Sequence, residues 1–174
     1  MERNIRVVKD ANGNQIVIVN DIRFKGRQHI AWDEVEQYLK RYVGDFVEIA
    51  ESKEIVYIGN DLPDEYAGSN YTTKLKGTLA KAKANAAQGL PEIVQIAENR
   101  RFQKNFAKKH NKNAKFGWHR YDSKFAIPVL DEMGKVLHYN IFQAEIIIRH
   151  SEDEKLYLYD IINIKKETGT PLEP

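Results

Sequence analysis

Short apolar runs alternate with turn signals near the start of the chain. Two runs, at residues 5–8 and 16–19, flank Asn12-Gly13, and Asn-Gly between apolar segments strongly favours a tight hairpin turn. Two more runs, at residues 46–49 and 55–58, predict a second hairpin. The first 60 or so residues are therefore expected to supply two antiparallel strand pairs.

A helix is expected between the two hairpins. Apolar residues recur at helical spacing over residues 35–42, and Asp33 with Glu36 three positions later matches a capping box, which makes Asp33 the predicted N-cap. A turn-rich stretch follows at residues 59–70. We interpret residues 1–70 as a small accessory α+β unit.

The middle of the chain is predicted to be helical. Residues 72–88 are rich in the strong helix formers Ala, Lys and Leu, and Gly89-Leu90-Pro91 closes this helix and opens another. From Pro91 an apolar stripe continues as far as Phe106. The second helix is expected to end near His110.

The last third of the chain alternates between apolar and polar residues as strands do. Four β-rich segments follow one another: residues 115–121, 124–130, 136–149 and 156–164. The second, third and fourth of these segments are joined by short polar links, and such links connect antiparallel neighbours. The predicted fold class is α+β: the N-terminal unit (1–70), then a domain (71–174) of helices followed by a four-stranded antiparallel sheet.

The last two segments can pair in two registers. A four-residue turn would place Asp160 opposite Glu145, two like charges in direct opposition. A five-residue turn instead pairs Ile148 with Leu158, and we expect this register because it keeps aliphatic side chains together. One open sheet face then carries Tyr139, Gln143, Glu145, Arg149, Tyr157, Tyr159, Asn163 and Lys165.

Composition limits what the protein can be. Its 174 residues are 42% hydrophobic, too apolar for a disordered chain, and no cysteine is present for disulfides, thiolate metal sites or cysteine nucleophiles. No apolar run approaches the roughly 20 residues of a membrane-spanning helix, and the first residues do not lead into a signal-peptide core. We expect a soluble, cytoplasmic protein with no membrane partner.

The formal net charge of +2 hides a strong division along the chain. Residues 71–124 carry 13 Lys and Arg against 3 Asp and Glu, whereas the segments on either side are acidic. Such a basic block attracts polyanions, although a solvated lysine-rich helix face gives the same pattern. The candidate RNA contacts are Lys83, Arg100, Arg101, Lys104, Lys108, Arg120 and Tyr157.

Several kinds of site are disfavoured by missing motifs. The sequence has no Walker A loop, Gly-x-Gly-x-x-Gly, His-Glu-x-x-His, EF-hand loop or Gly-x-Ser-x-Gly, and its five histidines lack metal-ligand spacing. We expect neither a metal site nor a cofactor.

The open sheet face carries groups that can cleave RNA without a metal. The Glu145 carboxylate can take the proton of a ribose 2′-OH, and the Arg149 guanidinium can hold the phosphate. His119 or a phenol can then protonate the leaving 5′ oxygen. Aromatic rings offer stacking surfaces for unpaired bases. The solvated face of any antiparallel sheet would show the same alternation.

Three segments resemble a known superfamily: Leu156 to Thr168 running into Gly169-Thr170-Pro171, Gly117-Trp118-His119-Arg120-Tyr121, and Arg149-His150. Through them residues 71–174 are similar to the phage and mobile-element nuclease-like domains of the barnase–EndoU–colicin–RelE (BECR) superfamily, found in large polyvalent proteins. The resemblance implies a metal-independent ribonuclease that leaves a 2′,3′-cyclic phosphate.

The same resemblance implies roles for particular residues. Glu145 matches the family's base and Arg149 its phosphate ligand, whereas no histidine matches its acid securely. It also makes Tyr159, Lys165 and Thr168 catalytic candidates.

Two function classes follow from the sequence. The first is a phage or mobile-element endoribonuclease, a toxin or effector that cuts tRNA or another structured RNA and is held in check by a cognate inhibitor protein. The second is a catalytically inert nucleic-acid-binding or phage-assembly module. Catalysis requires Glu145 and Arg149 to line one concave site within reach of a histidine or tyrosine.

Overall fold

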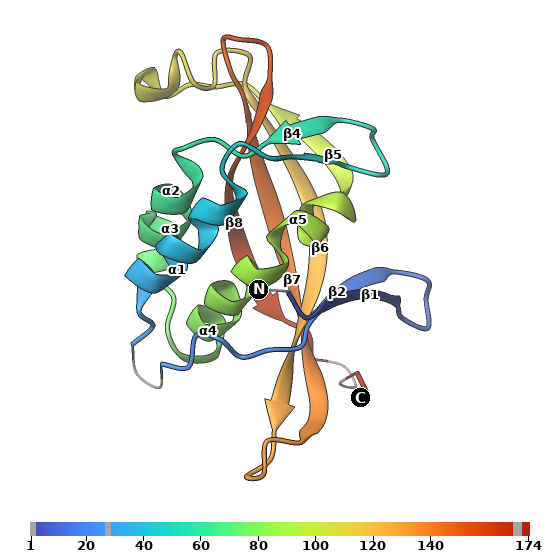
Figure 1. The fold of residues 1–174 in the computed structure, drawn as a ribbon. Coiled ribbons are helices and arrows are strands. Elements are labelled where there is room, and N and C mark those ends of the chain that lie inside the picture. The colour runs from blue at the N-terminus through green and yellow to red at the C-terminus, as the bar shows by residue number, and fades with distance from the viewer. Residues whose placement is uncertain (1–2, 27–28, 169–171) are drawn as a thin grey trace.

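Three long antiparallel strands form the centre of the protein: β6 (Trp118–Leu130), β7 (Val136–His150) and β8 (Leu156–Lys166) (Figure 1). The structure is a computed structural model that describes residues 3–26, 29–168 and 172–174. The Gly169-Thr170-Pro171 segment, part of the sequence resemblance, lies outside the described residues.

Two hairpins from the N-terminal part extend this centre on both sides. The hairpin of β1 (Ile5–Lys9) and β2 (Gln15–Val19) joins β6 through a parallel pairing of β2. The hairpin of β3 (Phe46–Glu48) and β4 (Ile55–Tyr57) joins β8 through a parallel pairing of β4. With β5 (Glu98–Gln103) beside β6, the result is one curled, eight-stranded sheet of order β1-β2-β6-β7-β8-β4-β3.

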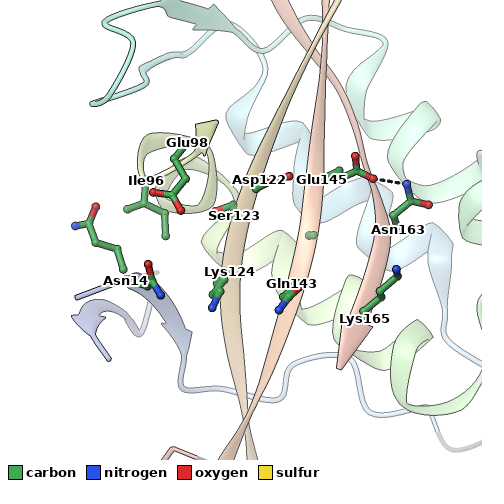
Figure 2. A pocket seen from close by; sticks show the side chains of 12 residues that line it. Asn14, Ile96, Glu98, Asp122, Ser123, Lys124, Gln143, Glu145, Asn163 and Lys165 are labelled. Carbon is green, nitrogen blue, oxygen red and sulfur yellow. Dashed lines mark hydrogen bonds between the residues drawn. The ribbon is translucent and has the colours of Figure 1, made fainter. Parts of the chain in front are cut away.

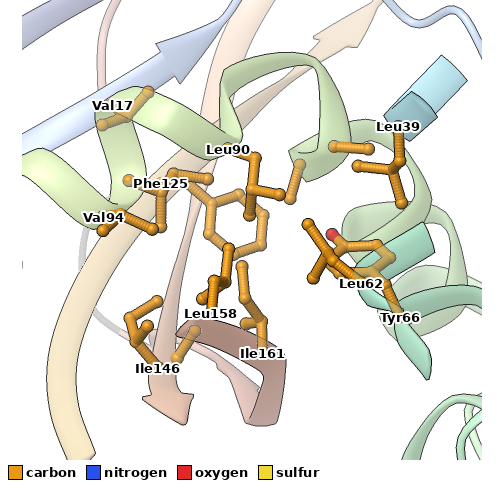
Figure 3. Packing of buried hydrophobic residues seen from close by; sticks show 14 of the residues in the cluster. Val17, Leu39, Leu62, Tyr66, Leu90, Val94, Phe125, Ile146, Leu158 and Ile161 are labelled. Carbon is orange, nitrogen blue, oxygen red and sulfur yellow. The ribbon is translucent and has the colours of Figure 1, made fainter. Parts of the chain in front are cut away.

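Short helices gather on one side of the long strands (Figure 1). They are α1 (Trp32–Leu39), α2 (Leu62–Gly68), α3 (Asn70–Thr73), α4 (Gly77–Ala86) and α5 (Leu90–Gln95), with 3-10 turns η1 (Lys40–Tyr42) and η2 (Ala87–Gly89). A third 3-10 turn, η3 (Lys108–His110), lies apart from them, with His110 against Trp118 and Tyr159. Between helices and sheet lies the main core, where Leu90, Phe125 and Leu158 are fully buried (Figure 3). Residues on both sides of position 70 contribute to this core.

The expected fold, a separate α+β unit followed by helices and a four-stranded sheet, is therefore wrong. The protein is a mixed α+β fold in which the eight strands that the structure describes belong to one sheet. The parallel pairings that attach the hairpins join segments about 100 residues apart, such as Val17 with Phe125 and Val56 with Leu156. No local pattern in the sequence reports such a pairing, because alternation only shows which face of a strand is buried.

The predicted helix from Pro91 to His110 is also wrong. The helix α5 ends at Gln95, and residues 98–103 form β5 instead. Asn99 has a φ of +63°, a left-handed conformation that a right-handed helix cannot contain. Phe102 and Phe106, expected to line a buried stripe, are 58% and 84% exposed. The first predicted helix is interrupted as well, because α4 begins only at Gly77.

Local strand predictions are confirmed in part. Both hairpins form, and Ile148 pairs with Leu158 as the five-residue turn requires, but a bulge then shifts the register so that Ile147 pairs with Asp160. Residues 115–121 and 124–130, expected as two strands, are largely one continuous strand, β6. The helix α1 is present, but its N-cap is Ala31 rather than Asp33.

A buried ion pair joins the helices to β8. Lys83 of α4 donates from Nζ to Asp160 Oδ1 at 2.7 Å and to Thr72 Oγ1 at 2.6 Å, and both charged side chains are fully buried. Ser69 donates to the other carboxylate oxygen of Asp160. Burial raises the pKa of Asp160 to about 6 and lowers the pKa of Lys83. The ammonium of Lys83 is enclosed, so this predicted RNA contact is not presented to solvent.

Candidate nucleic-acid interface

The side of β6, β7 and β8 that points away from the main core carries most of the chain's candidate chemistry. We call it the outer face. From β6 it presents Trp118, Arg120, Asp122 and Lys124; from β7 and β8 it presents Gln143, Glu145, Tyr159, Asn163 and Lys165. Two hollows lie along this face, one beside Trp118 and Tyr159 and the other beside Lys124 and Lys165.

The first hollow, which we call the aromatic groove, has a volume of about 570 Å³. Its walls come from the outer face, from the segment 103–110 and from the end of α2 with α3. Three rings meet edge to face: the centroids of Trp118 and Tyr159 are 4.9 Å apart, and His110 lies 5.0 Å from Trp118 and 5.6 Å from Tyr159. The other aromatic residues in its lining are Tyr71 and Phe106.

Hydrogen bonds fix the polar ends of these rings. Trp118 Nε1 donates to Asn105 Oδ1 at 3.3 Å, and the Tyr159 hydroxyl donates to Glu65 Oε1 at 2.9 Å. Burial and the neighbouring Glu65 carboxylate both raise the pKa of Tyr159, so the phenol is protonated at neutral pH. The rings are thereby held in place and present their surfaces to the groove.

Cations border the aromatic groove on two sides. Lys104 and Lys109 lie in its outer wall, and both are exposed. Arg120 lines its floor, with its guanidinium 3.8 Å from Glu145 Oε1. That separation is too long for a hydrogen bond. Within the described part of the chain the Arg120 side chain makes no hydrogen bond, which leaves its donors available for a ligand.

The second hollow, which we call the polar cavity, measures about 650 Å³ (Figure 2). Glu145 lies in it, 3.2 Å from the guanidinium of Arg101, and accepts a hydrogen bond from the Asn163 amide. Asp122 pairs with the same Arg101 at 2.8 Å. Burial opposes ionisation of Asp122, but hydrogen bonds from Arg101 and Asn99 lower its pKa overall. The carboxylates of Asp122 and Glu145 are thus both paired with Arg101 within the protein.

The structure does not bring the predicted pair of Glu145 and Arg149 together. They lie four residues apart on one strand, about 13 Å along it. Arg149 is 8% exposed and forms a bidentate pair with Asp61 at 3.2 Å, while its Nη1 donates to the Asn113 carbonyl. Its guanidinium also lies over the Tyr157 ring. Arg149 therefore serves to tie three segments together.

His119 lies on the opposite side of β6 from the aromatic groove. Its ring contacts those of Phe102 and His150, and its Nδ1 is buried without a hydrogen-bond partner in the described part of the protein. Burial lowers the pKa of His119, and the nearby Arg100 and His150 lower it further. The histidine that the fold brings to the groove is His110, where the sequence pattern predicts the end of a helix.

The other predicted residues are dispersed. Arg100 pairs with Glu54 at 2.6 Å, and the Tyr157 hydroxyl donates to Asp153 at 2.5 Å. Lys165 lies in the polar cavity, and Thr168 is exposed after the end of β8. Lys108 belongs to η3, and its side chain lies outside the described part. Of the predicted set, Lys104, Arg120 and Tyr159 share the aromatic groove.

The groove contains two functional candidates that sequence reasoning missed, Glu65 and His110. Glu65 belongs to α2, in the part of the chain interpreted as an accessory unit, and no motif marks it. His110 is carried by the segment after β5, whose path depends on the strand that replaced the predicted helix. The packing of α2 on β8 brings Glu65 to the Tyr159 hydroxyl, and the segment after β5 brings His110 to the same ring.

No protein-family model, curated protein or solved structure matches this chain. The resemblance to the BECR superfamily therefore stays a prediction. No helix in the described ranges is long and apolar enough to cross a membrane. Within those ranges no cluster of three or more His, Asp or Glu side chains has the arrangement of a metal site.

Proposed function

We propose that the protein binds single-stranded RNA on the outer face, with unpaired bases in the aromatic groove. The observation that carries this proposal is the meeting of three rings, Trp118, Tyr159 and His110, beside the guanidinium of Arg120, which makes no hydrogen bond in the described part of the protein. Aromatic platforms beside cations are the usual means of binding single strands, because bases stack on rings while cations contact phosphates.

A single strand suits the shape of the groove better than a duplex. The groove is lined by rings that stand edge to face and by a wall formed by segment 103–110. Paired bases are stacked within a helix and cannot enter such a hollow, whereas splayed bases can. Binding of this kind would take place in the cytoplasm, where RNA is available.

The test is equilibrium binding of a fluorescein-labelled single-stranded oligouridylate, measured by anisotropy at about 50 and 200 mM salt. We expect saturable binding that weakens as salt rises, because cations at the groove release counterions from phosphates. A duplex of the same length should bind more weakly. Equal affinity for the duplex, or no binding at the lower salt concentration, would contradict the proposal.

A second candidate function, metal-independent RNA cleavage, is favoured by a specific observation. A carboxylate, an imidazole and a guanidinium share the aromatic groove, with Glu65 bonded to the hydroxyl of Tyr159 and His110 against the same ring. Glu65 can remove the 2′-OH proton while O2′ attacks phosphorus, and Arg120 can hold the phosphate oxygens. His110 can then donate a proton to the leaving O5′, which leaves a 2′,3′-cyclic phosphate.

Cleavage is tested by incubating the protein with total tRNA in excess EDTA and identifying the new RNA ends. We expect cyclic-phosphate ends, reduced at least about 100-fold in Glu65→Gln and in His110→Ala, because each change removes a proton-transfer group. Glu65→Gln should keep its affinity for RNA whose 2′-OH groups are methylated, whereas His110→Ala also removes a stacking ring and should bind that RNA more weakly. Cleavage that is lost in Glu145→Gln but kept in Glu65→Gln would assign the general base to the polar cavity. If the wild-type protein leaves the RNA intact, cleavage is contradicted and the proposal of RNA binding still stands.

A further inference from the structure

A third hollow lies away from the outer face, where the long β6–β7 hairpin extends past α4 (Figure 1). We call it the α4 cavity. It has a volume of about 500 Å³, within the range of small-molecule sites. Most of its lining is apolar: Ile22, Ala82, Ile127, Val129, Leu130 and Phe142.

The apolar walls of the α4 cavity are continuous with the main core. Phe142 and Ala82 belong to that core and are almost fully buried, whereas Leu130 at the rim is 43% exposed. The helix α4 stops short of the hairpin's end, so the exposed Leu130 and the half-buried Ile22 and Val129 are left partly uncovered. An apolar body placed here would remove the hydrocarbon surface of these three side chains from water.

Two cations stand at the rim of the α4 cavity. Lys25 lines the cavity from the loop after β2, and Lys81 lines it from α4. No carboxylate belongs to the lining, and among the residues that the structure describes neither ammonium forms an ion pair. Lys83, two positions after Lys81 on the same helix, is fully paired with Asp160. The hydroxyl of Thr78 and the amide of Asn140 add neutral hydrogen-bonding groups.

We infer that the α4 cavity binds a small organic carboxylate with an apolar body, such as a medium-chain fatty acid. The carboxylate would lie between Lys25 and Lys81, where charge-assisted hydrogen bonds are strong. The hydrocarbon part would contact Ile22, Val129 and Leu130, the apolar lining residues that are still partly accessible. This site is separate from the aromatic groove and shares no lining residue with it.

The inference is tested by calorimetric titration of the full chain with decanoate and, as a neutral ligand of the same length, decanol. We expect decanoate to bind at least about 10-fold more tightly. The double variant Lys25→Met/Lys81→Met should lose that preference, because it keeps the apolar stems and removes both charges. Lys74→Met/Lys135→Met, which removes two exposed charges outside the cavity, should bind decanoate as the wild type does.

A second variant keeps both lysines and tests the rim directly. Leu130→Glu adds a carboxylate at an exposed position of the lining, and it should weaken decanoate binding by repulsion and by pairing with the lysines. Equal binding of decanol and decanoate, or unchanged binding in the double lysine variant, would overturn the inference. RNA binding is measured on the same proteins, and its presence or absence leaves this result unaffected.

Discussion

Replacing Lys83 with methionine is expected to destabilise the protein by about 3–5 kcal/mol at pH 7.5. The change removes the ammonium that pairs with Asp160 and leaves the carboxylate fully buried, with Ser69 and a backbone amide as its remaining donors. An unpaired charge in such a site must either stay ionised in a low dielectric or take up a proton. The measurement is urea-induced unfolding followed by circular dichroism.

The pH dependence of this variant distinguishes a charge effect from lost packing. Burial already raises the pKa of Asp160 to about 6, and removal of Lys83 should raise it further. A carboxyl whose pKa is higher in the folded protein than in the unfolded chain stabilises the fold when it is protonated. The deficit of Lys83→Met should therefore shrink as pH falls from 7.5 to 5.

Two further variants serve as controls. The double change Lys83→Met/Asp160→Leu replaces the pair with apolar groups and should recover most of the lost stability. Lys81→Met removes a partly exposed charge from the same helix and should alter the free energy of unfolding by less than about 0.5 kcal/mol. A Lys83→Met protein as stable as wild type, or a double variant as unstable as the single one, would contradict the buried-pair argument.

Trp118→Ala is expected to weaken binding of single-stranded RNA by about 10- to 100-fold. The ring forms one side of the edge-to-face cluster with Tyr159 and His110, so its removal deletes a stacking platform and loosens the other two rings. Base–aromatic stacking contributes about 1–3 kcal/mol per base, and 1.4 kcal/mol corresponds to a factor of ten. The measurement is anisotropy of the labelled oligouridylate.

The matched control is Phe46→Ala, which removes an exposed ring on β3 that does not line the aromatic groove. It should bind RNA as the wild type does. Arg120→Gln should lower the slope of log affinity against log salt by about one, because it removes one phosphate contact. If Trp118→Ala folds normally and binds RNA with unchanged affinity, the aromatic groove is not the binding site.

The candidate site was only partly accessible from the sequence. Lys104, Arg120 and Tyr159 were predicted from charge and strand alternation, and all three lie in the aromatic groove. Arg149 was predicted from the same alternation, but its guanidinium is engaged by Asp61, 88 residues earlier in the chain. Alternation shows which way a side chain points and does not show which distant group will neutralise it.

The sequence by itself determined the local structure of the sheet: both hairpins, the core side of β7 and the register of Ile148 with Leu158. These features depend on turn residues and on a two-residue period, which neighbouring positions specify. The tertiary structure decided the parallel attachment of β2 and β4 and the strand β5. It also decided the burial of Lys83 and the meeting of Glu65 with His110. Each of these features depends on contacts between segments that are far apart in the chain. The energies of such contacts cannot be inferred from a short stretch of sequence.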